Sequence, residues 1–439
     1  MRKLSIFMWG ILFSFLICSS GLAEQPASIN LADAINICQK YLADAGLENI
    51  EIQANLKQTI CISYENRRFR NEITALGIVL GYAVKCFPFA IQFIIVPKCR
   101  DVAIKHIKVN CNKFQKYVRN EISEEDFIKH LEVSYHPISA QVAGGYKTRN
   151  FKSTFFRFDL IASPGVKAQF ARPNDPAQMQ FNLLTDLSVT LARGLQFNSQ
   201  WMFPIYNEFQ VIESSYRLGQ LYLNQVVRLP SNTFFNMSIG MFEYDCPGIS
   251  TQLKKFIFKD NLRLAVRFDY LKAQSLQEYI AVNSSCKNNT SYLFQAQYFF
   301  EQINFRTELT WGKYVLGDKG WRIDITRTFH ELELGFMGVW SESLEFLTGM
   351  TIRLPFPLSR HPAPARVRIR PPRYFHWDYR YQPCFDGFIL NTGDNFEQIA
   401  RQFSKGFIKA NIHQFKTATR YVKFDEPEQS KQLLAEGES

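Results

Sequence analysis

Glu331 and Glu333 are the residues of this sequence whose spacing comes closest to a catalytic pair. They lie two residues apart in a run of alternating polar and apolar side chains, so both project from one face of a strand. Paired carboxylates carry the general acid and base chemistry of glycosidases. Alternatively, these two carboxylates only balance the charge of arginines on neighbouring strands, such as Arg322 or Arg353.

Other signatures of catalysis or cofactor binding are absent from the sequence. It has no Walker loop, dinucleotide-binding fingerprint, HExxH motif or GxSxG motif. Its seven histidines are scattered, and no CxxC pair or Cys/His cluster has the spacing of a zinc site. We therefore expect a protein that is not an enzyme and that holds neither a cofactor nor a metal ion.

Charged residues occupy the polar positions of several long alternating runs. They mix guanidinium groups with carboxylates and comprise Arg157, Asp159, Arg263, Arg267, Asp269, Arg306, Glu308, Arg322 and Asp324. Rows of this kind offer hydrogen bonds to the hydroxyls and carboxylates of a polysaccharide. They are equally the cross-strand charge pairs of a plugged barrel. The sequence leaves both interpretations open.

Residues 357–439 are expected to form a strap and a C-terminal tail, and within them residues 357–380 combine arginines with prolines and aromatic rings. The candidate ligand contacts of this segment are Arg366, Arg368, Arg370, Arg373 and Trp377. Arginine binds carboxylates through two parallel hydrogen bonds, and aromatic faces stack on sugar rings, so the segment could bind an acidic glycan. The alternative is a structural strap, packed on or into a barrel, whose prolines fix an extended path.

The elements that position these residues fall into distinct regions, and the first is a secretory signal. Arg2 and Lys3 precede an apolar run that ends at Cys18, and residues 21–23 form a small-residue cleavage site. The apolar run is shorter than the roughly 20 residues of a membrane-spanning helix. We expect cleavage near Ala23 and export of residues 24–439.

Residues 24–150 predict a small α+β module. Helices are expected at 31–45, at 70–83 and in a capped run from 123 to 131, and strands within 50–64, 89–96 and 102–109. The apolar stretch 76–96 is interrupted by Lys85 and Pro88, which indicates a helix end followed by a buried strand rather than a membrane helix.

Residues 151–356 change to strict alternation of apolar and polar side chains. The longest runs are 233–244, 248–258, 261–272, 291–301, 303–314, 319–329, 331–341 and 345–354. Strands of about 9–11 residues with this pattern are typical of transmembrane barrels, which turn apolar residues outward and polar residues inward. We therefore predict a mainly β fold, with a transmembrane antiparallel β-barrel of about 12–14 strands. A soluble β-sandwich, with strands of about 5–6 residues, is the alternative.

Composition and charge narrow the possible partners. The chain has 439 residues, of which 46% are hydrophobic and 15% aromatic, and this excludes disorder over its whole length. Its net charge is +11, but residues 151–356 carry 20 basic and 18 acidic side chains and are nearly neutral. The uniform basic field of a nucleic-acid-binding protein is missing, so no nucleic acid partner is expected.

Three short motifs resemble the YjbH-type outer-membrane proteins. They are YENRRFR at 64–70 followed by ALG at 75–77, GDKG at 317–320, and PPRY at 371–374. That family is linked to secretion of exopolysaccharide and group 4 capsule in Gram-negative bacteria. The resemblance runs from about residue 31 to about residue 390, and the chain has room for one barrel where well-known members carry two.

The resemblance and the signal together imply an outer-membrane location and a periplasmic position for the α+β module. We expect the barrel to assist export or assembly of an exopolysaccharide or capsule. Its expected partners are an acidic polysaccharide, outer-membrane lipid and other proteins of the export machinery. The alternatives are a porin-like or lipid-handling barrel and a secreted β-sandwich that binds glycans.

Overall fold

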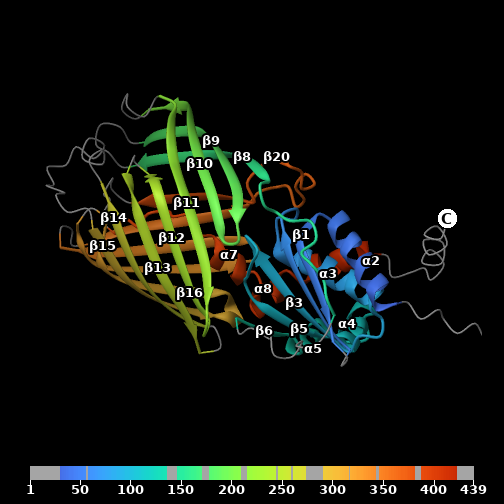
Figure 1. The fold of residues 1–439 in the computed structure, drawn as a ribbon. Coiled ribbons are helices and arrows are strands. Elements are labelled where there is room, and N and C mark those ends of the chain that lie inside the picture. The colour runs from blue at the N-terminus through green and yellow to red at the C-terminus, as the bar shows by residue number, and fades with distance from the viewer. Residues whose placement is uncertain are drawn as a thin grey trace, which may run out of the picture.

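The computed structural model describes residues 30–422, except 56–57, 136–145, 171–176, 209–214, 244–245, 259–260, 273–289, 316, 343–345 and 381–386. The predicted signal peptide and the polar tail after residue 424 lie outside these residues. Two bodies lie side by side, a small module of helices on a sheet and a much larger curved sheet (Figure 1).

The small module contains a mixed sheet. Its strands are β1 (Leu47–Ala54), β2 (Thr59–Asn66), β3 (Gln92–Cys99), β4 (Val102–Ala103), β5 (His106–Asn110), β6 (Glu132–Ser134) and β7 (Tyr146–Lys147). The order is β6-β5-β3-β2-β1-β7, with β4 paired to β3, and only β2 and β3 run parallel.

Four helices of this module begin where the sequence places a polar cap. They are α2 (Leu31–Asp44), α3 (Glu72–Cys86), α4 (Cys111–Val118) and α5 (Glu124–Lys129). The side chains of Asn30, Asn71, Asn110 and Ser123 each accept a hydrogen bond from a backbone N–H of the first turn. Stretch 76–96 contains the end of α3 and the start of β3, as predicted. Within the described ranges, no helix combines the length and the hydropathy that crossing a bilayer requires.

The C-terminal residues complete the hydrophobic core of the module. Helices α7 (Phe396–Arg401), α8 (Lys405–Ala410) and α9 (Ile412–Tyr421) follow the large sheet in sequence. The ring centroid of Phe415 lies 5.7 Å from that of Phe127 and 5.9 Å from that of Phe114. Helix α9 also packs closely on α3, because a Cβ atom at Gly77 would lie 2.7 Å from the carbonyl oxygen of Phe415. The module is therefore built from both ends of the described chain.

The large sheet has 14 strands. They are β8 (Phe158–Phe170), β9 (Ala177–Ala192), β10 (Leu195–Asn207), β11 (Arg217–Leu229), β12 (Thr233–Phe242), β13 (Cys246–Ile257), β14 (Leu262–Leu271), β15 (Thr290–Phe300), β16 (Phe305–Lys313), β17 (Lys319–Phe329), β18 (Leu332–Ser341), β19 (Leu347–Pro355), β20 (Val367–Arg370) and β21 (Tyr374–Arg380). Strands β8 to β19 pair in sequence order and antiparallel. The mainly β prediction is confirmed.

Two strands extend this sheet past residue 356, into the segment that the sequence suggested as a strap. Strand β20 pairs in parallel with β8, and β21 pairs antiparallel with β19. The two ends of the sheet meet where the ring centroids of Phe170 and Tyr379 lie 5.5 Å apart. Within the described ranges no backbone ladder joins β21 to β8 or β20, so a closed barrel stays a prediction.

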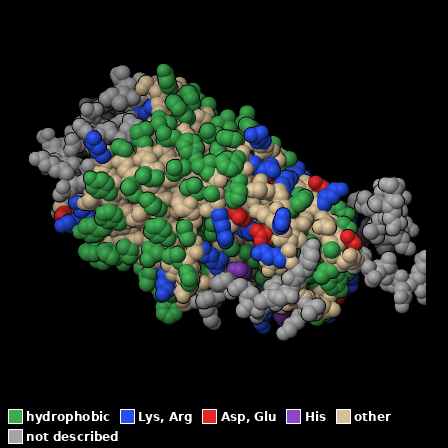
Figure 2. All heavy atoms as spheres, viewed as in Figure 1, with side chains coloured by type: hydrophobic (Ala, Val, Ile, Leu, Met, Phe, Trp, Pro, Cys, Tyr) green, Lys and Arg blue, Asp and Glu red, His purple; other side chains and the backbone are tan. Residues whose placement is uncertain are grey.

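The large sheet exposes its apolar side chains and buries its polar ones. In β14, Leu264, Val266 and Phe268 are 44–49% exposed, whereas Arg263 and Arg267 are each 5% exposed. Figure 2 shows the resulting cover of hydrophobic side chains over the large sheet. This polarity is the reverse of that of a soluble β-sandwich, which buries its apolar faces between two sheets.

The connections at the two ends of the sheet differ in length. Connections of two to four residues follow β9, β11, β13, β15 and β17, at the end that meets the module. At the opposite end the connections have three to eighteen residues. The segment 356–366, which joins β19 to β20, is the exception at the module end.

Candidate functional site

A polar cavity of about 680 Å³ lies between the concave face of the sheet and the module. Its lining includes 12 lysine and arginine side chains and 7 aspartate and glutamate side chains, a formal balance of +5. In Figure 2, basic and acidic side chains gather where the two bodies meet. This region is the candidate site because it brings together charged residues from the module, the sheet and the C-terminal segment.

One wall of the cavity, formed by β9, β10 and β11, presents mainly uncharged hydrogen-bonding groups. These include Ser188, Gln196, Asn198, Gln200 and Gln220. The amide nitrogen of Gln200 donates to Asp186 at 2.7 Å. The amide nitrogen of Asn198 is buried and has no hydrogen-bond partner within the described part of the chain.

The wall formed by β14 and β16 presents three of the predicted charged residues. Arg263 pairs with Glu308 at 2.9 Å and with Glu397 of α7 at 2.6 Å. Arg306 donates to the hydroxyl oxygen of Thr326 at 2.9 Å. Among the described residues, no carboxylate lies within 4 Å of the Arg306 guanidinium. Arg306 therefore brings to the cavity a positive charge that is not held in a direct ion pair.

Residues 387–397, which we term the inner segment, run along the concave face and lead into α7. Arg322 donates to the carbonyl of Gly387 at 2.9 Å, and Arg267 donates to the carbonyl of Leu390 at 3.0 Å. Asn224 and Ser238 both donate to the carbonyl of Thr392, at 3.1 and 3.0 Å. Donors from four strands thus hold a stretch of the chain inside the curve of the sheet.

The same arginines pair with carboxylates of their own strands. Arg267 contacts both oxygens of Asp269 at 2.9 and 3.1 Å, and Arg322 contacts both oxygens of Asp324 at 2.8 and 2.7 Å. None of these four side chains lines the cavity. These pairs lie within one strand and not across two strands, so they differ from the cross-strand pairs considered from the sequence, and their arginines hold the inner segment. Arg263, Arg306 and Glu308 remain candidates for ligand contact.

Three arginines of segment 357–380 form ion pairs and also line the cavity. Arg368 contacts both oxygens of Asp159 at 2.9 and 2.6 Å, and Arg370 contacts the same carboxylate at 3.3 Å. Arg373 pairs with Glu72 of α3 at 2.9 Å. All three arginines line the cavity.

The other two predicted contacts of this segment lie elsewhere. The Arg366 side chain is exposed and does not line the cavity. Strand alternation places Trp377 on the face of β21 opposite to His376, which does line the cavity. Trp377 is therefore not part of the candidate site.

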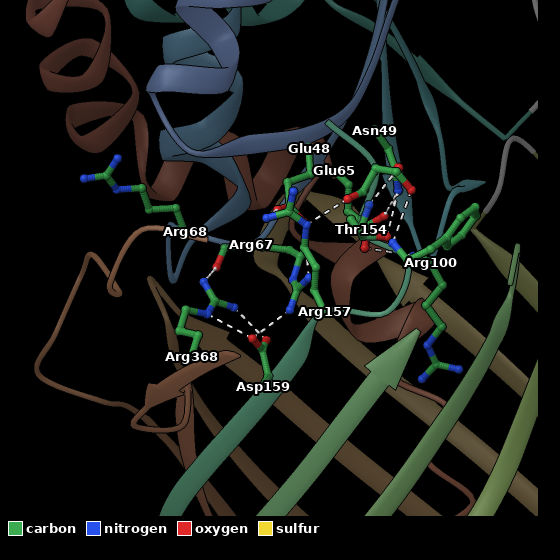
Figure 3. A network of polar contacts seen from close by, with 12 residues as sticks. Glu48, Asn49, Glu65, Arg67, Arg68, Arg100, Thr154, Arg157, Asp159 and Arg368 are labelled. Carbon is green, nitrogen blue, oxygen red and sulfur yellow. Dashed lines mark hydrogen bonds and ion pairs between the residues drawn. The ribbon is translucent and has the colours of Figure 1, made fainter. Parts of the chain in front are cut away.

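The motif at 64–70 forms the junction between the module and the sheet, a role that its sequence alone did not reveal. Arg67 pairs with Glu48 of the module at 3.2 Å and with Asp159 of the sheet at 2.7 Å. Glu65 accepts hydrogen bonds from the backbone N–H groups of Arg100 and Asp101, both at 3.0 Å. Figure 3 shows Arg67 and Arg368 converging on Asp159.

Burial perturbs the carboxylates of this junction. Desolvation raises the pKa of Glu48, although Arg67 and Arg157 act in the opposite direction. Desolvation also raises the pKa of Glu72, against the effect of Arg373. Each carboxylate is nevertheless paired with arginine, Glu48 with Arg67 and Arg157 and Glu72 with Arg373.

The two glutamates considered as a catalytic pair are bound by different arginines. Glu331 is held by Arg70 at 2.8 and 3.0 Å, and Glu333 pairs with Arg353 at 2.9 Å. The pair of Glu333 with Arg353 is the charge balance considered from the sequence, whereas Glu331 is balanced by Arg70 of the module. Within the described ranges, no group of three or more His, Cys, Asp or Glu residues could hold a metal ion.

Comparison with known families gives one match. The model of the YjbH family, described as exopolysaccharide biosynthesis protein YbjH, matches residues 21–340. The chain belongs to this family. The match spans the module up to β7, β8 to β17 and most of β18, and it includes the motifs at 64–70 and 317–320. No curated protein matches the chain. Membership implies a role in exopolysaccharide biosynthesis.

Proposed function

We propose that this protein is a non-enzymatic outer-membrane β-barrel that assists export or assembly of an exopolysaccharide. The observation that carries the proposal is the reversed polarity of the 14-stranded sheet, with Leu264, Val266 and Phe268 exposed and Arg263 and Arg267 buried. Water does not favour such a surface, whereas a bilayer does. The contact between Phe170 and Tyr379 brings the ends of the sheet close enough for closure.

The connection lengths support a periplasmic position for the module. Outer-membrane barrels have short turns on the periplasmic side and longer loops outside. Here the connections of two to four residues meet the module. The expected signal peptide at residues 1–23 is consistent with export to that compartment.

The inner segment favours an assisting role over that of an open porin. A porin needs a continuous water-filled channel. In this chain, donors such as Arg267, Arg322 and Asn224 hold residues 387–397 along the concave face. A passage for polymer would have to run beside that segment or follow its displacement.

Fractionation of a producing bacterium tests the location. We expect the protein in the outer-membrane fraction, with migration on gels that changes on heating, and with the module protected from protease in intact cells. Recovery in the soluble periplasm would contradict the barrel. Deletion of the gene tests the role, because unchanged amount and attachment of surface polysaccharide would contradict assistance in export or assembly.

A further inference from the structure

The cavity between module and sheet contains more positive charge than its own carboxylates neutralise. Arg306 has no carboxylate within 4 Å among the described residues, and its bond to Thr326 leaves most of its donors unused. At another wall, Arg67, Arg368 and Arg370 share the single carboxylate of Asp159. Arg370 makes the longest of these contacts, at 3.3 Å, so it is the arginine least committed to that carboxylate.

The wall that these arginines face has a different chemistry. Ser188, Gln196, Asn198 and Gln220 offer hydroxyl and amide groups without charge. The buried amide nitrogen of Asn198 has no partner within the described ranges, and buried donors are normally satisfied. A ligand suited to both walls carries many hydroxyls and at least one anionic group.

We propose that this cavity binds an acidic saccharide, with Arg306 and Arg370 contacting its carboxylates and the β9–β11 wall contacting its hydroxyls. The inference rests on the proposed function and adds the substrate class to it. Guanidinium groups bind carboxylates bidentately, and side-chain amides can both donate to and accept from a sugar hydroxyl. The cavity volume of about 680 Å³ falls within the range of roughly 300–1,000 Å³ that is usual for ligand sites.

The structure gives variants that test this site without leaving a buried carboxylate unpaired. Arg306→Gln removes a cation that has no ion pair, and Arg370→Gln leaves Asp159 with Arg67 and Arg368. Matched controls are Arg327→Gln on the neighbouring strand, whose guanidinium lies over the Phe329 ring, and Arg366→Gln in the segment before β20. Neither control residue lines the cavity.

Calorimetric titration of the full-length protein in detergent, with trigalacturonate as the probe, is the decisive measurement. We expect binding that weakens about tenfold or more in each of Arg306→Gln and Arg370→Gln and stays unchanged in the two controls. Maltotriose, which has the hydroxyls without the carboxylates, is expected to bind at least tenfold more weakly.

Four outcomes would overturn the inference: no binding of trigalacturonate, equal binding of maltotriose, equal loss in the control variants, or inorganic phosphate competing as well as the saccharide does. The last outcome would assign the site to a simple anion. Since the titration uses purified protein, its failure leaves the polysaccharide phenotype of the gene deletion intact as a separate test of the proposed function.

Discussion

The guanidinium of Arg70 holds both carboxylate oxygens of Glu331, at 3.0 and 2.8 Å, across a separation of 261 residues. Arg70 precedes α3 of the module, and Glu331 lies in the short turn between β17 and β18. The Glu331 side chain is only 4% exposed. This pair fastens the module to one end of the sheet.

Arg70→Met is expected to loosen the module from the sheet. Breaking a buried ion pair leaves an unpaired charge, which costs about 3–5 kcal/mol. Protease cleavage of the module and the temperature of unfolding in detergent measure the effect. The matched control is Lys409→Met, which removes an exposed pair with Glu125 that also joins a C-terminal helix to the module. We expect that control to cost less than about 1 kcal/mol, and similar effects of the two variants would contradict the role of Arg70.

Acid is expected to weaken the same junction. Burial alone would raise the pKa of Glu331, but hydrogen bonds from Arg70 and Gln414 hold this pKa below its usual value. A carboxylate whose pKa is lower in the folded protein than in the unfolded chain stabilises the fold. This contribution is fully present above the pKa of the unfolded chain, about 4.3, and is lost as the pH falls through the pKa of the folded protein. Unfolding temperatures between pH 3 and pH 6 should therefore fall toward the acid end. Glu331→Gln should show a smaller fall, and an unchanged slope would contradict this account.

Asp159 is expected to matter more than any one of the arginines around it. Asp159→Asn would leave Arg368 and Arg370 as buried like charges without their carboxylate, and Arg67 with Glu48 alone, at a cost of about 3–5 kcal/mol. Arg370→Gln, in contrast, removes one contact of 3.3 Å, leaves Asp159 paired with Arg67 and Arg368, and relieves repulsion between cations, so we expect a smaller loss of stability. The two variants are compared by the temperature at which heating changes the migration of the protein on gels. The reverse order would show that Asp159 does not organise this cluster.

Gly77→Ala is expected to destabilise the packing of α9 on α3. Alanine is favoured over glycine inside a helix by about 1 kcal/mol, so a purely local effect would be stabilising. The new Cβ would lie 2.7 Å from the carbonyl oxygen of Phe415, a backbone atom that cannot move alone. We expect a net loss of about 1–3 kcal/mol and earlier protease cleavage of the C-terminal helices. A gain in stability would contradict the close packing.

The hydrogen bonds that hold the inner segment on the sheet can be removed without changing the net charge of the protein. Asn224→Ala combined with Ser238→Ala removes both donors to the carbonyl of Thr392. Asn236→Ala is the matched control, because Asn236 contacts Asn224 but not the segment. In planar bilayers we expect low conductance for the native protein and the control, and more frequent opening for the double variant. Equal conductance of all three would show that the segment does not obstruct the path.

Strand positions could be predicted from the sequence because their signal is local. The alternating run at 319–329 coincides with β17 (Lys319–Phe329), and the run at 261–272 differs from β14 (Leu262–Leu271) by one residue at each end. Period-two alternation depends only on which side chains face the bilayer or the interior. The caps at Asn71 and Ser123 are local in the same way.

The pairings between distant segments could not be predicted in this way. Nothing local distinguishes β20, which pairs in parallel with β8, from an extended strap. The partners of Arg368 and Arg373, Asp159 and Glu72, lie more than 200 residues away in the sequence. The alternating pattern predicts that Arg267 and Arg322 point inward. It does not predict that residues 387–397 run back along the concave face and supply the carbonyl oxygens that accept their hydrogen bonds.

The position of Phe415 in the module core has a consequence for assembly. Helices α2 to α5 are made first, yet the surface on which they bury Phe114 and Phe127 is finished only by α9. An emerging chain therefore presents an incomplete apolar face until α9 is made, after the whole sheet. Formation of the sheet and completion of the module core are thus coupled, and a chain truncated after β21 would leave Phe114 and Phe127 without the ring of Phe415.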